Sequence, residues 1–219
     1  MTRVLMTGFE PFGGETVNPS QLALQQLSAG WSLAGVELST AFLPVVFGQS
    51  VQAMRSAIEA HDPELVVCVG EAGGRHAVTP ERFAVNLDNA PFPDNAGQAP
   101  VDQPIVPAGP VAYFSTLPLA AIVRSLRAAG IPAAQSSTAG NYVCNHVFYG
   151  LMHLMATERP DLRGGFVHVP HVHEQVLDRL DGRPSLSLAT LTEALRIVAE
   201  TSVMSSSAPS ALRLASATG

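Results

Sequence analysis

A cysteine and a histidine, Cys144 and His168, lie at sequence positions where a nucleophile and a general base could act. Cys144 follows a loop of small residues, 136–140, and stands where a helix is expected to begin. Unpaired N–H groups and the dipole of a helix N-terminus favour a thiolate and lower a thiol pKa from about 8.5. His168 ends the apolar run 165–169 and could supply the base that a thiol needs. The competing interpretations are structural, because most free cysteines are small buried hydrophobes and a strand can end on a histidine that only packs.

Glu81 is the carboxylate that could orient such an imidazole. It follows the apolar run 65–69 and a glycine-rich loop. Ligands of open α/β sheets gather beyond the carboxyl ends of the strands, where His168 and the loop before Cys144 are also expected. A Cys–His pair held by a carboxylate is the triad of acyl transfer. Taken alone, Glu81 is better explained as a surface carboxylate, and Cys68, inside the run 65–69, is expected to be structural.

A cluster of imidazoles offers a different chemistry. His168, His171 and His173 lie within six residues, followed by Glu174, and zinc hydrolases use such ligands. Pro170 interrupts the regular geometry between them, and no distant Asp- or Cys-rich segment completes the set. A metal-dependent hydrolase is therefore the alternative to a cysteine enzyme.

The amino-acid composition argues against several other classes of enzyme and of binding protein. All 12 basic residues among the 219 are arginine, so no lysine is present for a P-loop, a Schiff base or a Ser–Lys dyad. The net charge of −6 disfavours a nucleic-acid partner. Two cysteines make no disulfide framework, and no apolar run approaches the roughly 18 residues of a membrane span. The N-terminal apolar run is too short for a signal peptide, so we expect a soluble cytoplasmic protein without a membrane partner.

The elements that must position these residues follow an alternating pattern. Strands are expected over 3–7, 36–43, 65–69, 131–136 and 165–169, and helices over 18–27, 47–60, 119–129, 142–157 and 187–203. The third strand is apolar on both faces, as a central parallel strand should be. Strand–helix alternation predicts a doubly wound α/β domain over 1–204, with a long irregular excursion over 90–110 and a frayed Ser/Ala-rich tail over 205–219.

Four segments occur in one order along the chain. They are Gly8-Phe9-Glu10-Pro11-Phe12-Gly13-Gly14 with Asn18-Pro19-Ser20, then Thr79-Pro80-Glu81-Arg82, then Ala139-Gly140-Asn141-Tyr142-Val143-Cys144-Asn145-His146, and finally Gly164-Gly165-Phe166-Val167-His168-Val169-Pro170. Together they resemble the pyroglutamyl peptidase I family, also called pyrrolidone-carboxylate peptidase. The resemblance runs from about Val4 to Val203.

The resemblance implies a cysteine peptidase that removes an N-terminal pyroglutamyl residue from peptides. Cys144 would be the nucleophile, His168 the base and later the acid, and Glu81 the residue that orients His168. It also implies a single-domain three-layer α/β/α sandwich with a twisted, mostly parallel central sheet. No metal or organic cofactor is implied, and the family often assembles as a homotetramer. The residues expected to bind substrate are Phe9, Phe12, Glu71, Tyr142 and Val143.

Three positions depart from the family pattern. Glu71 stands where many relatives have Gln, Pro91 where relatives often have Arg, and Tyr142 where some have Phe. A carboxylate offers no hydrogen-bond donor to a lactam oxygen unless it is protonated. We expect pyroglutamyl specificity to be retained, and a catalytically inactive relative that serves as a binding protein is the third hypothesis.

Overall fold

A five-stranded sheet forms the centre of the molecule, for which the computed structural model describes residues 1–179 and 181–205. Its strand order is β2-β1-β3-β7-β4, and the first four strands are mutually parallel whereas β4 is antiparallel to β7. The strands are β1 (Thr2–Phe9), β2 (Val36–Leu43), β3 (Leu65–Glu71), β4 (Thr79–Pro80) and β7 (Arg163–Val169). The predicted mostly parallel sheet is confirmed.

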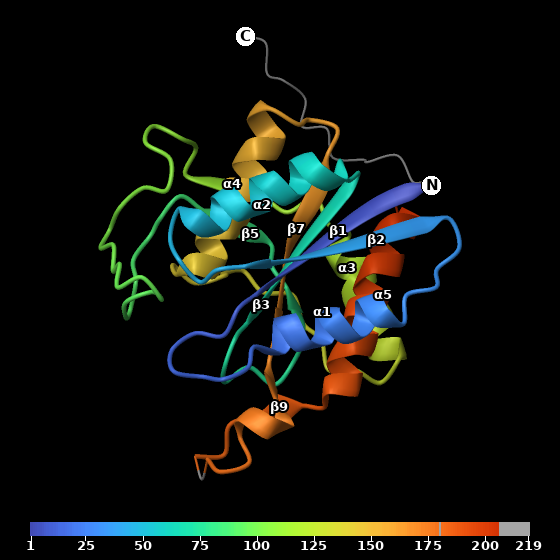
Figure 1. The fold of residues 1–219 in the computed structure, drawn as a ribbon. Helices are drawn as coiled ribbons and strands as arrows, with labels where there is room; N and C mark the ends of the chain where they lie inside the picture. The colour runs from blue at the N-terminus through green and yellow to red at the C-terminus, as the bar shows by residue number, and fades with distance from the viewer. Residues whose placement is uncertain (180, 206–219) are drawn as a thin grey trace.

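Helices cover both faces of this sheet (Figure 1). On one face lie α2 (Gln49–His61) and α4 (Val143–Thr157), and on the other α1 (Pro19–Ala29), α3 (Leu119–Ala128) and α5 (Leu188–Met204). The predicted single-domain three-layer α/β/α sandwich is thereby confirmed. The short elements are β5 (Phe83–Val85), β6 (Ala112–Phe114), β8 (His171–Val172), the 3-10 helix η1 (His173–Gln175) and β9 (Ser185–Leu186).

The alternation of side chains along β3 divides the core into two halves. Val67 and Val69 pack toward α1, α3 and α5, whereas Val66 and Cys68 pack toward α2 and α4. All residues of β3 except Glu71 are buried, which agrees with its continuous apolar run. Because β3 lies between β1 and β7, its carboxyl end faces the middle of one edge of the sheet.

The start of α1 follows from three polar or rigid residues. Asn18 is the N-cap, and its side chain accepts a hydrogen bond from the Ser20 N–H at 3.0 Å. Pro19 occupies the first helical position, where its missing N–H costs nothing. The Ser20 hydroxyl accepts from the backbone N–H of Phe9 at 3.0 Å and so joins the helix to the end of β1.

The segment 131–136 does not form the predicted strand. It makes only two isolated bridges, Val78 to Ala133 and Glu81 to Ser136, beside the two-residue edge strand β4. Four backbone hydrogen bonds join this segment to 78–82, but Pro80 has no N–H to donate, so the ladder is interrupted. The segment still runs alongside Glu81, because Ser136 forms a bridge with it.

Other boundaries shift by a few residues. The helix predicted from 47 begins at Gln49, and the strand predicted to end at 69 continues to Glu71. The excursion over 90–110 contains no named helix or strand, as predicted. Of the predicted tail, residues 206–219 lie outside the described part of the chain.

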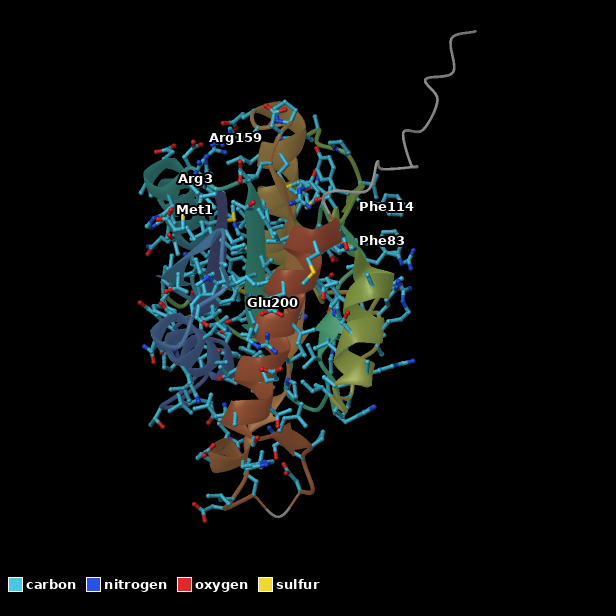
Figure 2. All side chains as sticks on the ribbon, turned by 90° about the vertical axis from the view of Figure 1, so that its right-hand side faces the viewer. Met1, Arg3, Phe83, Phe114, Arg159 and Glu200 are labelled. Carbon is cyan, nitrogen blue, oxygen red and sulfur yellow. The ribbon has the colours of Figure 1, made fainter. Side chains whose placement is uncertain are left out.

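Two phenylalanines, Phe92 and Phe114, are exposed among the described residues. Phe83 and Phe114 form an edge-to-face pair with ring centroids 4.9 Å apart on the β5–β6 ribbon, and Phe114 is 65% exposed (Figure 2). No helix within residues 1–179 or 181–205 is long and apolar enough to cross a membrane.

Candidate active site

Strand β4 brings Glu81 to His168 although 87 residues separate them. Thr79 pairs with His168 in the antiparallel register, and the Glu81 N–H donates to the Phe166 carbonyl at 2.9 Å. Glu81 Oε1 lies 2.8 Å from His168 Nδ1, and both side chains are almost completely buried. The pair predicted from the sequence therefore exists as a direct hydrogen bond.

The pKa values of this pair point to an ionised carboxylate and a neutral imidazole. Burial alone would raise the pKa of Glu81, but the hydrogen bond with His168 and the charge of Arg75 outweigh it, and the pKa is lowered. Burial lowers the pKa of His168 despite the opposing effect of Glu81. A neutral imidazole whose Nδ1–H donates to Glu81 has an unprotonated Nε2, which is the form required of a general base.

Cys144 is the second residue of α4, as the sequence predicted. Tyr142 is the N-cap and provides no side-chain hydrogen bond, so the N–H groups of the first turn are not capped by a side chain. A Cβ built on Gly70 would lie 2.8 Å from Cys144 Sγ, which places the sulfur directly over the backbone of β3. Gly70 is the register partner of His168 across β3 and β7. Within the described residues, Sγ has no hydrogen-bond partner.

The expected lowering of the thiol pKa is wrong for the unliganded protein. Burial raises the pKa of Cys144 to about 12, and the carboxylates of Glu71 and Glu81 add to the rise. Desolvation and two nearby negative charges therefore outweigh the helix N-terminus. Cys68 is fully buried, its Sγ contacts Met54 Sδ at 4.0 Å, and burial raises its pKa to about 12 as well. These features agree with the structural role predicted for Cys68.

A pocket opens beside Cys144 and contains about 220 Å³ of empty space, counting the part open to solvent. All five residues predicted to bind substrate line it together with the thiol. The lining residues are Phe9, Phe12, Asn18, Val45, Glu71, Tyr142, Val143 and Cys144. The Phe12 and Tyr142 rings lie 6.3 Å apart, so the walls are largely aromatic and apolar. Such walls suit a compact uncharged ring.

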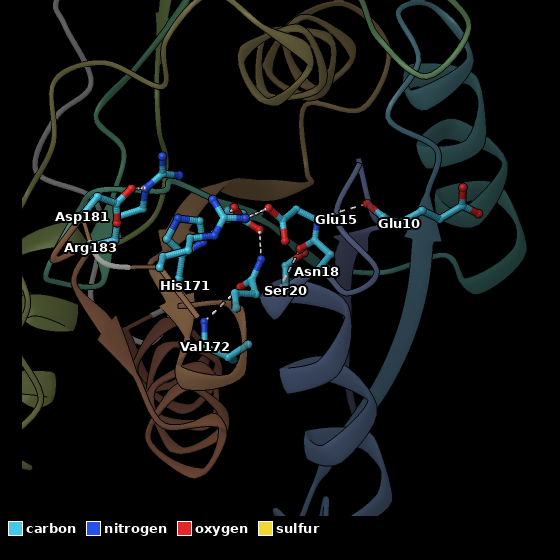
Figure 3. A network of polar contacts seen from close by, with 11 residues as sticks. Glu10, Glu15, Asn18, Ser20, His171, Val172, Asp181 and Arg183 are labelled. Atoms are coloured by element: carbon cyan, nitrogen blue, oxygen red, sulfur yellow. Dashed lines mark hydrogen bonds and ion pairs between the residues drawn. The ribbon is translucent and has the colours of Figure 1, made fainter. Parts of the chain in front are cut away.

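Glu71 is the carboxylate of this pocket and contacts His171, which Figure 3 shows in a network of polar contacts that also contains Glu15. Gln175 Nε2 donates to Glu71 Oε2 at 3.1 Å, and His171 Nδ1 lies 3.1 Å from its Oε1. Its pKa is raised, chiefly by burial, while Gln175 and His171 oppose the rise. In the same network, Arg179 pairs with Glu15 of the β1–α1 loop.

The three predicted zinc ligands are not brought together. His168 contacts Glu81, His171 contacts Glu71, and His173 contacts the Ser185 hydroxyl at 2.8 Å. Pro170 separates β7 from β8, and β8 pairs with β9 rather than with the central sheet, so the imidazoles point to different partners. Residues 1–179 and 181–205 contain no group of three or more His, Cys, Asp or Glu side chains that could hold a metal ion.

The arrangement has three residues that sequence reasoning did not single out. Arg75 contacts Glu81, and Asn145 binds the backbone of Val85 through both its oxygen and its nitrogen. His146 Nδ1 lies 2.8 Å from a buried Asp88 carboxylate. A signal for Asn145 and His146 was available, because two polar residues in the first turn of an otherwise apolar helix need buried partners.

A buried carboxylate–imidazole pair beside a thiol at a helix N-terminus defines the class of cysteine-type hydrolases. A family model described as pyroglutamyl peptidase matches residues 2–205. The chain is 58% identical over 196 residues to pyrrolidone-carboxylate peptidase of Streptomyces coelicolor, covering 90% of this chain and 89% of the relative. It is 49% identical to that of Bacillus licheniformis, covering 92% and 93%. The chain therefore belongs to the pyroglutamyl peptidase family.

Solved structures agree with this assignment. Pyroglutamyl peptidase I from Bacillus amyloliquefaciens superposes with a TM-score of 0.89 at 48% identity, covering 92% of this chain and 94% of that one. A mutant pyrrolidone carboxyl peptidase from Pyrococcus furiosus gives 0.89 at 40% identity, covering 93% and 99%. The sequence resemblance is thereby confirmed, and with it the assignment to a hydrolase family of the cysteine peptidase type.

Proposed function

We propose that this protein hydrolyses the bond after an N-terminal pyroglutamyl residue of peptides, through a Cys144–His168–Glu81 triad and a thioester intermediate. The observation that carries the proposal is the 2.8 Å contact between Glu81 and His168, with the Cys144 sulfur over the strand residue paired to His168. Family membership supports the same substrate class.

The resting site favours general-base catalysis over a preformed ion pair. Because the thiol pKa is raised and that of His168 is lowered, the proton stays on sulfur until substrate arrives. His168 Nε2 then takes that proton while Sγ attacks the pyroglutamyl carbonyl carbon. The imidazolium returns the proton to the departing amine, which leaves as the new N-terminus of the peptide. Water, activated by the same imidazole, cleaves the thioester and releases pyroglutamate.

The N-terminus of α4 is the proposed oxyanion site. No side chain caps this helix, and the first intrahelical backbone bond beyond the cap runs from the His146 N–H to the Tyr142 carbonyl. The N–H groups that precede it in the first turn are therefore available to an oxyanion formed beside Cys144. Loss of one such donor costs about 3 to 4 kcal/mol in serine proteases.

The pocket lined by Phe9, Phe12, Tyr142 and Val143 is proposed to hold the lactam ring, with Glu71 as its polar contact. Asn18 is less suited to contact substrate, because its side-chain oxygen accepts from Ser20 and its nitrogen donates to the Glu10 carbonyl at 3.1 Å. An apolar pocket that holds a buried carboxylate disfavours free glutamate, whose negative charge would lie beside Glu71.

Family membership also supports proposals on cellular location, assembly and cofactors. We propose that the protein acts in the cytoplasm and assembles as a homotetramer, without a metal or organic cofactor. The exposed Phe114, paired with the half-buried Phe83, is an apolar surface that is available to such an assembly.

The test is turnover of a pyroglutamyl chromogenic substrate by the purified chain, by Cys144→Ala and by a matched Cys68→Ala variant. We expect activity in the wild type and in Cys68→Ala, and none in Cys144→Ala. Thiol alkylation should abolish activity, whereas chelation should leave it unchanged. Loss on chelation would favour a metal-dependent hydrolase, and absence of turnover in the wild type would favour a binding protein.

A further inference from the structure

Arg75 joins three separate parts of the site through one guanidinium group. It lies in the loop between β3 and β4, and its Nη1 is 2.5 Å from both Glu81 Oε1 and Thr79 Oγ1. Its Nη2 donates to the Thr138 carbonyl at 2.9 Å. The oxygen of Glu81 that Arg75 contacts is the same oxygen that accepts from His168.

Thr138 belongs to the loop that leads into the nucleophile helix. Its hydroxyl accepts from the Gly140 N–H at 3.1 Å, and Gly140 has a positive φ of 76°, which favours glycine. Four backbone hydrogen bonds join the segment before it to 78–82, the last from the Arg82 N–H to the Ser136 carbonyl. Beyond Ser136, the loop that leads to α4 is held by contacts within 136–140 and by the hydrogen bond from Arg75, which comes from the loop after β3.

We propose that Arg75 is a positioning residue that holds Glu81 and the loop before Cys144 as one unit, so that nucleophile and base keep their relative placement. The proposal rests on the triad proposed above. Arg75 does not touch the reacting atoms; it acts through Glu81 on His168 and through Thr138 on the start of α4. A planar guanidinium with donors on two nitrogens suits this bridge.

The same contact has an electrostatic consequence at His168. The charged groups that act on this imidazole are Glu81 after β4 and Arg75. Glu71 at the end of β3 acts on the Cys144 thiol instead, together with Glu81 and Arg75. Arg75 lowers the pKa of His168 and of Glu81, and so helps to keep the base neutral and its partner ionised. Removal of its charge should therefore raise the pKa of His168.

Two substitutions at this position separate the bridge from the charge. Arg75→Gln removes the charge and one of the two nitrogen positions, whereas Arg75→Lys keeps the charge on a point-like ammonium that cannot span Glu81 and Thr138 as the fork does. Arg82→Gln is the matched control. Arg82 is the residue that follows Glu81, and its side chain is exposed. Its guanidinium binds Gln135, in the segment before Thr138, and does not contact the triad.

Steady-state kinetics as a function of pH is the first measurement. We expect Arg75→Gln to lose about 10- to 100-fold in kcat/KM, as supporting residues of catalytic sites typically do, and to shift the acid limb to higher pH. Arg75→Lys should lose kcat while its acid limb stays near that of the wild type. Arg82→Gln should match the wild type in both. Thermal unfolding of each variant confirms that it is folded.

NMR titration of the His168 imidazole is the second measurement, and it requires no turnover. A higher pKa in Arg75→Gln than in the wild type supports the proposal even if the pyroglutamyl substrate is not the right one. Wild-type kcat/KM and an unchanged His168 titration in folded Arg75→Gln would overturn it. Full activity in Arg75→Lys would overturn the bridging role, and equal losses in Arg82→Gln would attribute the effect to general destabilisation.

Discussion

Gly70→Ala tests whether the placement of the Cys144 sulfur over β3 is required for activity. A Cβ at this position would lie 2.8 Å from Cys144 Sγ and 2.8 Å from Phe166 Cζ. Non-bonded heavy atoms prefer about 3.5 to 4.0 Å, so the sulfur and the ring must each move by about 1 Å. Glycine is needed here for its lack of a side chain and not for its backbone conformation, since its φ is not positive.

Gly70→Ala should lower both the free energy of unfolding and kcat/KM, and the two effects can be measured separately. Overpacking of a dense core costs about 1 to 3 kcal/mol, which corresponds to a fall in Tm of about 2 to 12 °C for a chain of this size. A nucleophile displaced by about 1 Å costs about 100-fold in rate. We therefore expect kcat/KM to fall about 100-fold at a temperature where Gly70→Ala is still folded.

Gly165→Ala is the matched control because it overpacks the opposite face of the neighbouring strand. Its Cβ would overlap Ser115 Oγ and meet Leu117 Cδ1 at 2.9 Å, in the core half that contains α3 and α5. This variant should lose comparable stability and keep its kcat/KM per folded molecule. If Gly70→Ala kept kcat/KM within twofold of the wild type, the placement of the sulfur over β3 would not matter for the reaction. Equal losses of activity in Gly70→Ala and Gly165→Ala would also show that the reaction does not depend on the placement of the sulfur over β3.

The sheet was predictable because its signal is local. The runs that became β2 and β3 are short and followed by helical periodicity, and β3 is apolar over 65–69, as a buried parallel strand should be, whereas β2 mixes apolar with polar residues and is mostly half-buried. The segment 131–136 is less apolar, and although it exchanges four backbone hydrogen bonds with 78–82 it forms no continuous strand. The reason lies outside it, in Pro80 of a neighbour that is only two residues long, so tertiary context overrides local propensity.

The candidate site was predictable in its residue types and less so in its electrostatics. Strand ends and a helix start can be identified along the sequence, which is sufficient to bring Glu81, His168 and Cys144 to one edge of the sheet. The raised pKa of Cys144 depends on how many atoms surround the sulfur and on two carboxylates from other elements. Arg75 was missed for a similar reason, since its role arises only when its loop meets residue 138.

Three further experiments test separate features of the structure. Alkylation of Cys144 by iodoacetamide should accelerate steadily between about pH 6 and 9, since a thiol with a pKa of about 12 has no low-pH thiolate; a plateau from about pH 6 would indicate a preformed ion pair. Asp88→Ala should lower the free energy of unfolding in urea by about 1 to 3 kcal/mol because it leaves Nδ1 of the buried His146 without its partner. Asp62→Ala, which breaks exposed ion pairs, should cost less than about 1 kcal/mol. Glu71, whose pKa burial raises, can donate a hydrogen bond to a lactam oxygen only while protonated, so the wild-type KM should increase as pH rises through that pKa while the KM of Glu71→Gln stays level. Parallel KM profiles in the two proteins would mean that the carboxyl group does not contact the lactam.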